Sequence, residues 1–337
     1  MARAIAAGRP DLAVTASGGT SPALSVVIVA VAGTASVERT MRHLRAQTAR
    51  RTMEVVVVAS EAGVVDAEAL GAGEFAAFRV VAVGPITARG AAAAAGMLAA
   101  TAPVVGLIED HSFPEPEWAA ALLAAHAGAW SGVGPSVENG NPRLAMSWVN
   151  FILTYGIFSG DPPAGERDLL PWHNSAYKRA ALAPFADRLG ALLEWEGHLQ
   201  DALRANGHRL YLEPRARTHH LNVSGVSSTF ALHAYRARIM GAQRAEREGW
   251  PMWRRVLQAS AFPLFPLLQL RYLSANLRAI AIPRPLAGRV RAGLWSALCV
   301  MAFAEAWGLV AGAGDATVQM EDFELHRERH LSRADVP

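Results

Sequence analysis

The 337-residue chain contains very little cysteine and very little lysine. Cys299 is its one cysteine, which excludes a disulfide framework and a cysteine-rich zinc site, and makes a reducing, cytoplasmic environment the default expectation. Lys178 is its one lysine, so arginine supplies nearly all of the 32 basic residues. Because the net charge is only +3 and aromatic residues do not alternate with basic ones, the sequence predicts no nucleic-acid partner.

Three longer patterns are missing as well. Residues 1–20 lack the uninterrupted apolar core of a signal peptide, and we expect a disordered tail up to residue 22. Residues 32–36 read Ala-Gly-Thr-Ala-Ser, without the glycine-rich fingerprint of a dinucleotide-binding turn, which argues against a nicotinamide-dependent oxidoreductase. No uncharged apolar stretch reaches the roughly 20 residues that cross a bilayer comfortably.

Short apolar runs rich in β-branched residues alternate with helical patterns in the first third of the chain. The runs predict strands at residues 24–32, 54–59, 78–83 and 103–108. Between the first two, Ser36 can begin a helix that places Val37, Met41 and Leu44 on one face. This order predicts an α/β fold with a doubly wound, mostly parallel sheet.

The last of these strands ends in Glu109, Asp110 and His111. The carboxyl ends of strands are where an open α/β sheet binds its ligands. Carboxylate oxygens are hard ligands for a divalent cation, and an added imidazole suits Mn²⁺ at least as well as Mg²⁺. We therefore predict a cation site with Asp110 as its first ligand. The alternative is that Asp110 and His111 only end the strand and cap the turn that follows.

Several short motifs follow one another in the order typical of one enzyme family. They lie at residues 24–32, 44–47, 54–58, 88–90, 109–118, 170–179, 194–196 and 203–219. Over residues 23–225 this series resembles the family 2 glycosyltransferases with a GT-A fold, of the bacterial, membrane-associated type. The resemblance implies a metal-assisted, inverting, hexosyltransferase-like enzyme of polysaccharide biosynthesis. It would move a sugar from a nucleotide-diphosphate donor to a saccharide or lipid-linked acceptor.

The resemblance also places a general base near residue 195, which would remove the proton from the attacking acceptor hydroxyl. Glu196 is the candidate, and Glu194 is its rival. The alternative for Glu196 is an ordinary glutamate that stabilises the first turn of a helix. Trp195 could stack on a sugar or belong to the core.

Other site residues are implied by the same resemblance. For the donor nucleotide they are Ala30, Ala32, Ser60, Glu61, Arg89, Glu109 and Asp110. For the sugar or the acceptor they are Trp172, His173, Asn174 and Trp195, and for the metal they are Asp110, His111 and His219. The aspartate that ends the family's second strand is missing here, where the chain reads Ala59-Ser60-Glu61. Glu61 could replace it if the turn is reshaped, with a surface glutamate as the alternative reading. Arg89 could pair with the diphosphate or form a surface salt bridge.

The last third of the chain has a different character. Apolar stretches at residues 256–270 and 292–304 are flanked by arginine and tryptophan. They predict either helices that lie in a membrane interface or a packed helical hairpin, including one that forms a homodimer. We therefore expect a membrane-associated or dimerising region at residues 226–325, a tail at 326–337, and a cytoplasmic protein bound to the inner membrane. A non-catalytic nucleotide-sugar-binding scaffold protein remains the alternative function.

Overall fold

The computed structural model describes residues 11–17, 21–195, 197–332 and 335. The chain forms two compact units. The first unit comprises residues 1–137 and 161–219, and the second comprises residues 138–160 and 220–337. Residues 138–160, which we expected in the N-terminal domain, therefore belong with the C-terminal helices.

The first unit is built on a sheet whose first half is parallel. Its parallel strands are β2 (Leu24–Val29), β3 (Met53–Ala59), β4 (Ala77–Ala82) and β5 (Val104–Leu107), in the spatial order β4-β3-β2-β5. Every residue of β2, β3 and β5 is buried, as is expected for strands covered on both faces. The predicted strands are confirmed, and their carboxyl ends lie together at one edge of the sheet.

The sheet continues beyond the parallel strands on both sides. The further strands are β1 (Asp11–Ser17), β6 (Ser112–Pro114), β7 (Gly132–Asn139), β8 (Gly165–Arg167), β9 (Ala176–Lys178) and β10 (Leu210–His220). β9 pairs antiparallel with both β5 and β7, and β8 pairs antiparallel with β10. The full order is β1-β4-β3-β2-β5-β9-β7-β10-β6, with β8 beside β10.

β1 corrects one expectation. Residues 11–17 were predicted to be part of a disordered tail, but they pair antiparallel with β4 along its outer edge. The reason is that an edge strand offers a row of backbone amides and carbonyls, which a short neighbouring segment can pair with through its backbone alone.

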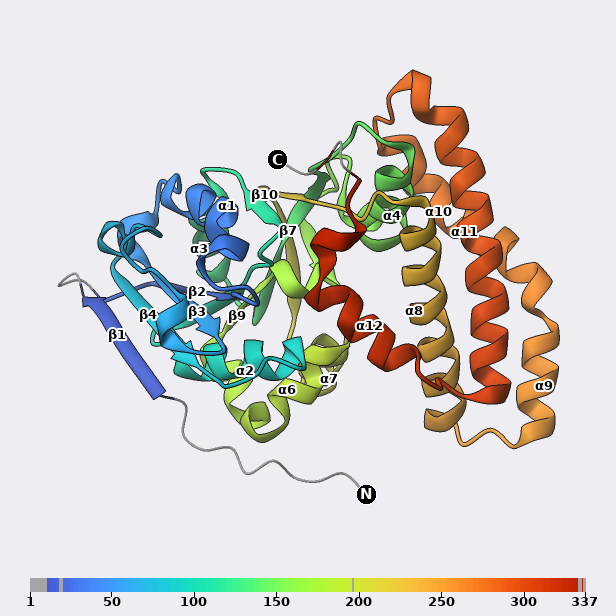
Figure 1. The fold of residues 1–337 in the computed structure, drawn as a ribbon, viewed down its shortest axis with the longest axis horizontal. Helices are drawn as coiled ribbons and strands as arrows, with labels where there is room; N and C mark the ends of the chain where they lie inside the picture. The colour runs from blue at the N-terminus through green and yellow to red at the C-terminus, as the bar shows by residue number, and fades with distance from the viewer. Residues whose placement is uncertain (1–10, 18–20, 196, 333–334, 336–337) are drawn as a thin grey trace. The chain divides into compact units, whose positions relative to one another are not determined.

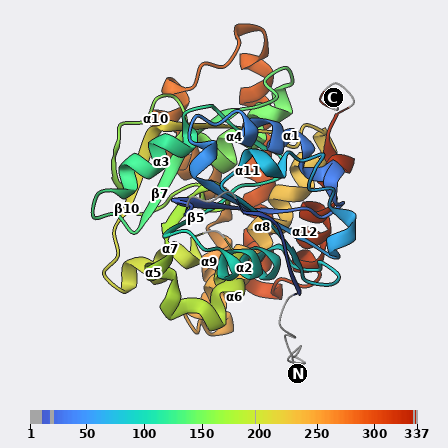
Figure 2. The same cartoon turned by 90° about the vertical axis from the view of Figure 1, so that its left-hand side faces the viewer.

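Helices cover both faces of this sheet. They are α1 (Thr34–Arg45), α2 (Arg89–Ala99), α3 (Trp118–His126), α5 (Arg179–Leu182), α6 (Leu189–Glu194) and α7 (His198–Ala205). Short 3₁₀ turns are η1 (Arg50–Thr52), η2 (Ala62–Val64), η3 (Ala72–Glu74), η5 (Trp172–Asn174) and η6 (Ala183–Arg188). Figures 1 and 2 place α1 and α3 on one face, and α2 and α6 on the other. α2 packs against the strands so closely that a Cβ atom at Gly96 would clash with Val27 and Val58.

The second unit is helical. Its elements are α4 (Ala145–Tyr155), η4 (Gly156–Phe158), α8 (Val226–Arg247), α9 (Met252–Ser260), η7 (Phe262–Leu264), α10 (Phe265–Ala279), α11 (Arg284–Ala311), α12 (Ala316–Leu325) and η8 (Arg327–His330). α8, α11 and α9 lie side by side (Figure 1). α8 and α11 approach closely at Gly241 and Gly308, where a Cβ atom on either glycine would clash with backbone of the other helix.

α11 is longer than the apolar stretch predicted from the sequence. It has 28 residues, because the helix continues past Arg291 at one end and Glu305 at the other. By length and composition alone it could cross a membrane, so the expectation that no segment is long enough is wrong for this helix. The core helix of a soluble protein passes the same test, and 39% of the apolar window of α11 is buried within the protein.

Candidate functional site

The carboxyl ends of β2, β3 and β5 carry the predicted donor-binding residues of the first unit. Ala30 follows β2, is buried, and donates its amide to the Val58 carbonyl at 2.8 Å. Ser60 and Glu61 follow β3, and Glu61 is exposed. Because β2 lies between β3 and β5, the ends of β3 and β5 are about 10 Å apart, which is two strand spacings. Ala32 is exposed in the turn that leads to α1.

The segment after β5 is held in place by α1. The hydroxyl of Thr40 donates to the backbone carbonyl of Asp110 at 2.8 Å and approaches that of Ser112 at 3.1 Å. Thr40 is fully buried on a helix, so its hydroxyl is satisfied by this loop. The contact fixes the backbone from which the Asp110 and His111 side chains project. The sequence analysis did not identify Thr40, although a threonine on an otherwise apolar helix face is a visible signal.

Asp110 accepts two charged or polar contacts. Its Oδ1 lies 3.0 Å from Nη2 of Arg89, at the beginning of α2, and 2.6 Å from Nδ1 of His111. Burial tends to raise the pKa of Asp110, but the Arg89 charge and the His111 contact outweigh it and lower the pKa to about 2. Asp110 is therefore a carboxylate at neutral pH, as a cation ligand must be.

Glu109 is the centre of a second set of contacts. Its side chain is 7% exposed, and its Oε2 accepts a hydrogen bond from Nδ2 of Asn174 at 2.8 Å. Its Oε1 lies 3.5 Å from Nδ1 of His173 and 3.6 Å from Nε2 of His111. The antiparallel pairing of β9 with β5 brings Asn174 next to Glu109. Beside this pairing, the Leu107 amide donates to the Ser175 carbonyl at 3.0 Å, which places the residue before Ser175 near the end of β5.

These side chains fit a divalent cation. Two atoms that bind one cation at right angles, each at about 2.1 Å, are about 3 Å apart. Among the described residues, Oε1 of Glu109 and Nε2 of His111 lie 3.6 Å apart, close to this spacing. Oδ1 of Asp110 lies 2.6 Å from Nδ1, the other ring nitrogen, so Asp110 can orient His111 while Nε2 faces the cation beside Glu109. Glu109 and His111 are both buried. The mixed oxygen and nitrogen donors suit Mn²⁺ or Mg²⁺.

The second acidic segment has a different arrangement. The carboxylate of Glu194 accepts a hydrogen bond from the Gly90 amide at 3.1 Å, so it caps the first turn of α2. A carboxylate at that position is also favoured by the helix dipole. Trp195 is half-buried directly after α6. Glu196, the predicted base, lies outside the described residues.

The loop before β9 supplies the predicted sugar-binding residues. Trp172 and His173 are half-buried, and their rings meet edge to face with centroids 5.4 Å apart. Nε2 of His173 lies 3.2 Å from the Leu193 carbonyl, which ties this loop to α6. Asn174 is fully buried against Glu109, so its amide positions that carboxylate.

His219 does not join this cluster. Its Nε2 lies 3.0 Å from Oε1 of Glu115, and both side chains are about two-fifths exposed. The structure thus brings together Arg89, Glu109, Asp110, His111, His173 and Asn174, and leaves His219 beside Glu115. The next residue on the strand, His220, belongs to the second unit, where its Nδ1 lies 2.9 Å from Oδ1 of Asn222.

Comparisons with known proteins add one finding about the fold. No protein-family model and no curated protein matches this chain. Among solved structures, it is similar to the mannosyltransferase PcManGT from Pyrobaculum calidifontis, solved in complex with GDP-Man and Mn²⁺. The match covers 90% of this chain and 89% of that chain, with a TM-score of 0.54 and 17% sequence identity. At this identity the likeness establishes a shared α/β fold.

Proposed function

We propose that this protein is a glycosyltransferase of the GT-A type, related to family 2. It moves a sugar from a nucleotide-diphosphate donor to a saccharide or lipid-linked acceptor, with inversion at the anomeric carbon. The observation that carries the proposal is the convergence of Glu109, Asp110 and His111 at the end of β5. The solved mannosyltransferase, which has a similar fold over nine-tenths of both chains, supports it.

A divalent cation bound at this site would neutralise charge on the departing diphosphate. Glu109 and His111 are the residues that would hold it, and Asp110 would orient the His111 ring through Nδ1. Arg89 presents a planar fork of N–H donors suited to phosphate oxygens. Since Arg89 now pairs with Asp110 at 3.0 Å, donor binding would exchange part of this ion pair for contacts with the diphosphate.

The transfer itself needs one proton acceptor. The acceptor hydroxyl oxygen attacks the anomeric carbon, its proton passes to a carboxylate, and the bond from the anomeric carbon to the diphosphate oxygen breaks. We assign the role of proton acceptor to Glu196. Glu194 is the weaker candidate, because its carboxylate already accepts a hydrogen bond from the Gly90 amide. His173 narrows the space beside Glu109, and Trp172 offers a ring for a sugar face.

The test combines binding with turnover. The purified chain is incubated with GDP-Man, UDP-Glc or dTDP-Glc, with and without Mn²⁺, while thermal stability and release of the nucleoside diphosphate are recorded. We expect stabilisation and release with one nucleotide class, both dependent on Mn²⁺. Asp110→Asn should strongly weaken both, because a neutral amide neither pairs with the Arg89 charge nor fixes the tautomer and orientation of His111. Glu117→Gln is the control, since Glu117 is an exposed acid outside the cluster.

The outcomes separate the two candidate functions. Stabilisation without nucleotide release, even when saccharide acceptors are supplied, would favour a non-catalytic nucleotide-sugar-binding scaffold. If no nucleotide sugar stabilises the protein, the assignment of this cluster as a donor-binding site is wrong.

A further inference from the structure

The second unit has large apolar side chains that are exposed and do not pack in its core. α9 has no buried residue, although it carries four large apolar side chains, Met252, Trp253, Val256 and Leu257. All four are exposed, and Trp253 is 68% exposed. At these spacings the four side chains share one side of the helix. A helix that packed this side into its own core would bury it, so the exposed side is available to another surface.

The exposed apolar surface continues through η7 into α10. It includes Leu264, Leu267, Leu268 and Tyr272, with Leu268 65% exposed. We call eight of the exposed apolar side chains of α9, η7 and α10 the α9–α10 face. Its members are Met252, Trp253, Val256, Leu257, Leu264, Leu267, Leu268 and Tyr272.

The charge around this face has one sign. Residues 249–304 contain seven arginines and neither aspartate nor glutamate. Arg254 and Arg271 are exposed on α9 and α10, and Arg278 and Arg284 are exposed at the neighbouring helix ends. Exposed arginines beside tryptophan and leucine suit a surface that combines anionic groups with hydrocarbon.

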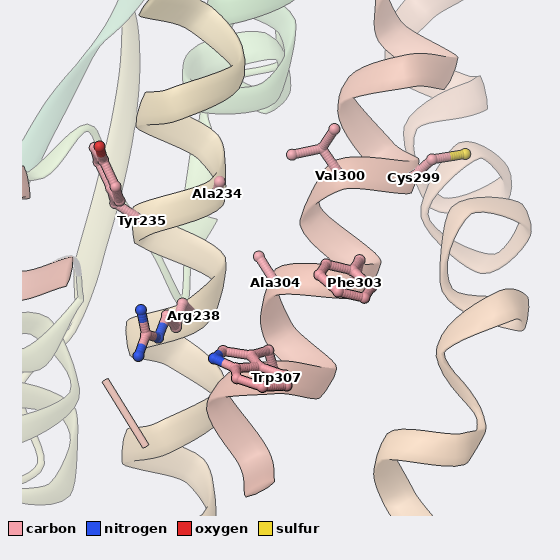
Figure 3. Close-up of a pocket in the computed structure, with 8 residues that line it drawn as sticks. All are labelled: Ala234, Tyr235, Arg238, Cys299, Val300, Phe303, Ala304 and Trp307. Atoms are coloured by element: carbon pink, nitrogen blue, oxygen red, sulfur yellow. The ribbon is translucent and has the colours of Figure 1, made fainter. Parts of the chain in front are cut away.

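A hollow adjoins the same face. A depression of about 470 Å³ lies between α8 and α11, lined by Tyr235 and Arg238 of α8 and by Phe303 and Trp307 of α11, among others (Figure 3). Phe303 is 63% exposed and meets the ring of Phe262 in η7 edge to face, with centroids 6.5 Å apart. The apolar surface is therefore continuous from this hollow to the segment between α9 and α10.

We propose that the α9–α10 face lies on the surface of an anionic lipid bilayer, with its apolar side chains in the interface and the arginines at the headgroups. Three separate observations support the proposal. One side of α9 exposes apolar side chains, residues 249–304 carry only positive charges, and the apolar surface is continuous with the hollow between α8 and α11. The proposal does not depend on transferase activity.

The test is flotation of the purified full chain with vesicles. One set is neutral phosphatidylcholine, and in the other set half of the lipid is phosphatidylglycerol. We expect at least tenfold stronger partitioning to the anionic vesicles, and release by 0.5 M salt, because arginine–headgroup attraction is screened. Combined Trp253→Ser, Leu257→Ser and Leu268→Ser should reduce the partitioning at least tenfold.

Two single variants serve as matched controls. Leu98→Ser in α2 and Val318→Ser in α12 also remove exposed apolar side chains, which are 56% and 66% exposed, and should leave partitioning unchanged. Equal binding to neutral vesicles overturns the proposal, as does binding that resists both salt and alkaline carbonate, which would indicate a spanning α11. The proposal also fails if vesicles are not bound and the triple variant converts a dimer into a monomer.

Discussion

Glu54 is a fully buried carboxylate in the middle of an apolar sheet, and each of its oxygens has a donor. Ser25 donates to it, Arg79 Nε approaches it at 2.5 Å, and the amide and hydroxyl of Thr101 donate at 2.8 and 2.9 Å. Burial alone would raise the Glu54 pKa, but these hydrogen bonds lower it. A buried charge with complete partners ties β3 to β2, to β4 and to the loop before β5.

At the residue scale we therefore predict that Glu54→Gln destabilises the first unit. The amide cannot accept every donor and leaves Arg79 without a charged partner, so the free energy of unfolding should fall by about 2–4 kcal/mol. Glu74→Gln is the control, because the Arg45–Glu74 pair is more than one-third exposed and should cost less than about 1 kcal/mol. Equal losses in urea unfolding would contradict the assignment of Glu54.

The two glutamates near residue 195 should separate catalysis from stability. Glu196→Gln is expected to lower kcat by about 10²–10⁴-fold, the usual contribution of a general base, with little change in Tm. Glu194→Gln should lower the stability of the first unit by about 1 kcal/mol, because it weakens the cap on the Gly90 amide. Steady-state kinetics and thermal unfolding of both variants decide between them. A larger loss of kcat in Glu194→Gln would reverse the two roles.

At the scale of elements, two glycines set the approach of α8 and α11. Gly241 and Gly308 lie where each helix meets backbone of the other, and a Cβ atom at Gly308 would clash with the Arg238 carbonyl. Small residues at a crossing let two helices pack backbone against backbone. The polar atoms of Arg238 are held nearby, since its Nε donates to the Gly312 carbonyl at 3.1 Å.

We predict that Gly308→Ala destabilises the second unit by about 2 kcal/mol, because the helices must move apart. Gly288→Ala lies on the same helix with no atom within 4 Å of the added methyl group. It should instead stabilise the protein by about 0.5–1 kcal/mol through helix propensity. Thermal unfolding of the two variants gives the comparison, and a neutral Gly308→Ala would mean that the crossing is not tightly packed.

The elements also show what the sequence could and could not predict. Residues 55–58 are four buried valines, and such a run has few alternatives to a central strand. β9 is only three residues, Ala-Tyr-Lys, with no alternation to mark its face or register. The contact between Asn174 and Glu109 depends on that register, so the sequence predicted both residues in the site but not their pairing.

At the scale of the whole molecule, each unit contains a buried histidine. Burial is the main cause that lowers the pKa of His126, in the first unit, and of His233, in the second, each to about 4. An unfolded histidine titrates near pH 6.5. Between these values the unfolded chain binds a proton that the folded chain does not, so stability falls as the pH is lowered from about 6.5 towards 4.

We expect each histidine to cost about 2 kcal/mol of stability between pH 7 and pH 5. Urea unfolding at the two pH values measures the loss. His233→Gln should reduce the pH dependence of the second unit, and His126→Gln that of the first, since glutamine does not titrate. An unchanged dependence in both variants would assign the acid sensitivity to other groups.

β1 bears on the solubility of the protein. It pairs with β4 through backbone hydrogen bonds and covers what would otherwise be the open edge of the parallel strands. A shortened chain without β1 would keep every residue of the candidate site, yet would present a bare strand to which another copy could add. With β1 in place the edge strand is β1 itself, whose register is irregular between Val14 and Ala16, and such an edge is a poorer template for a second copy than the regular β4.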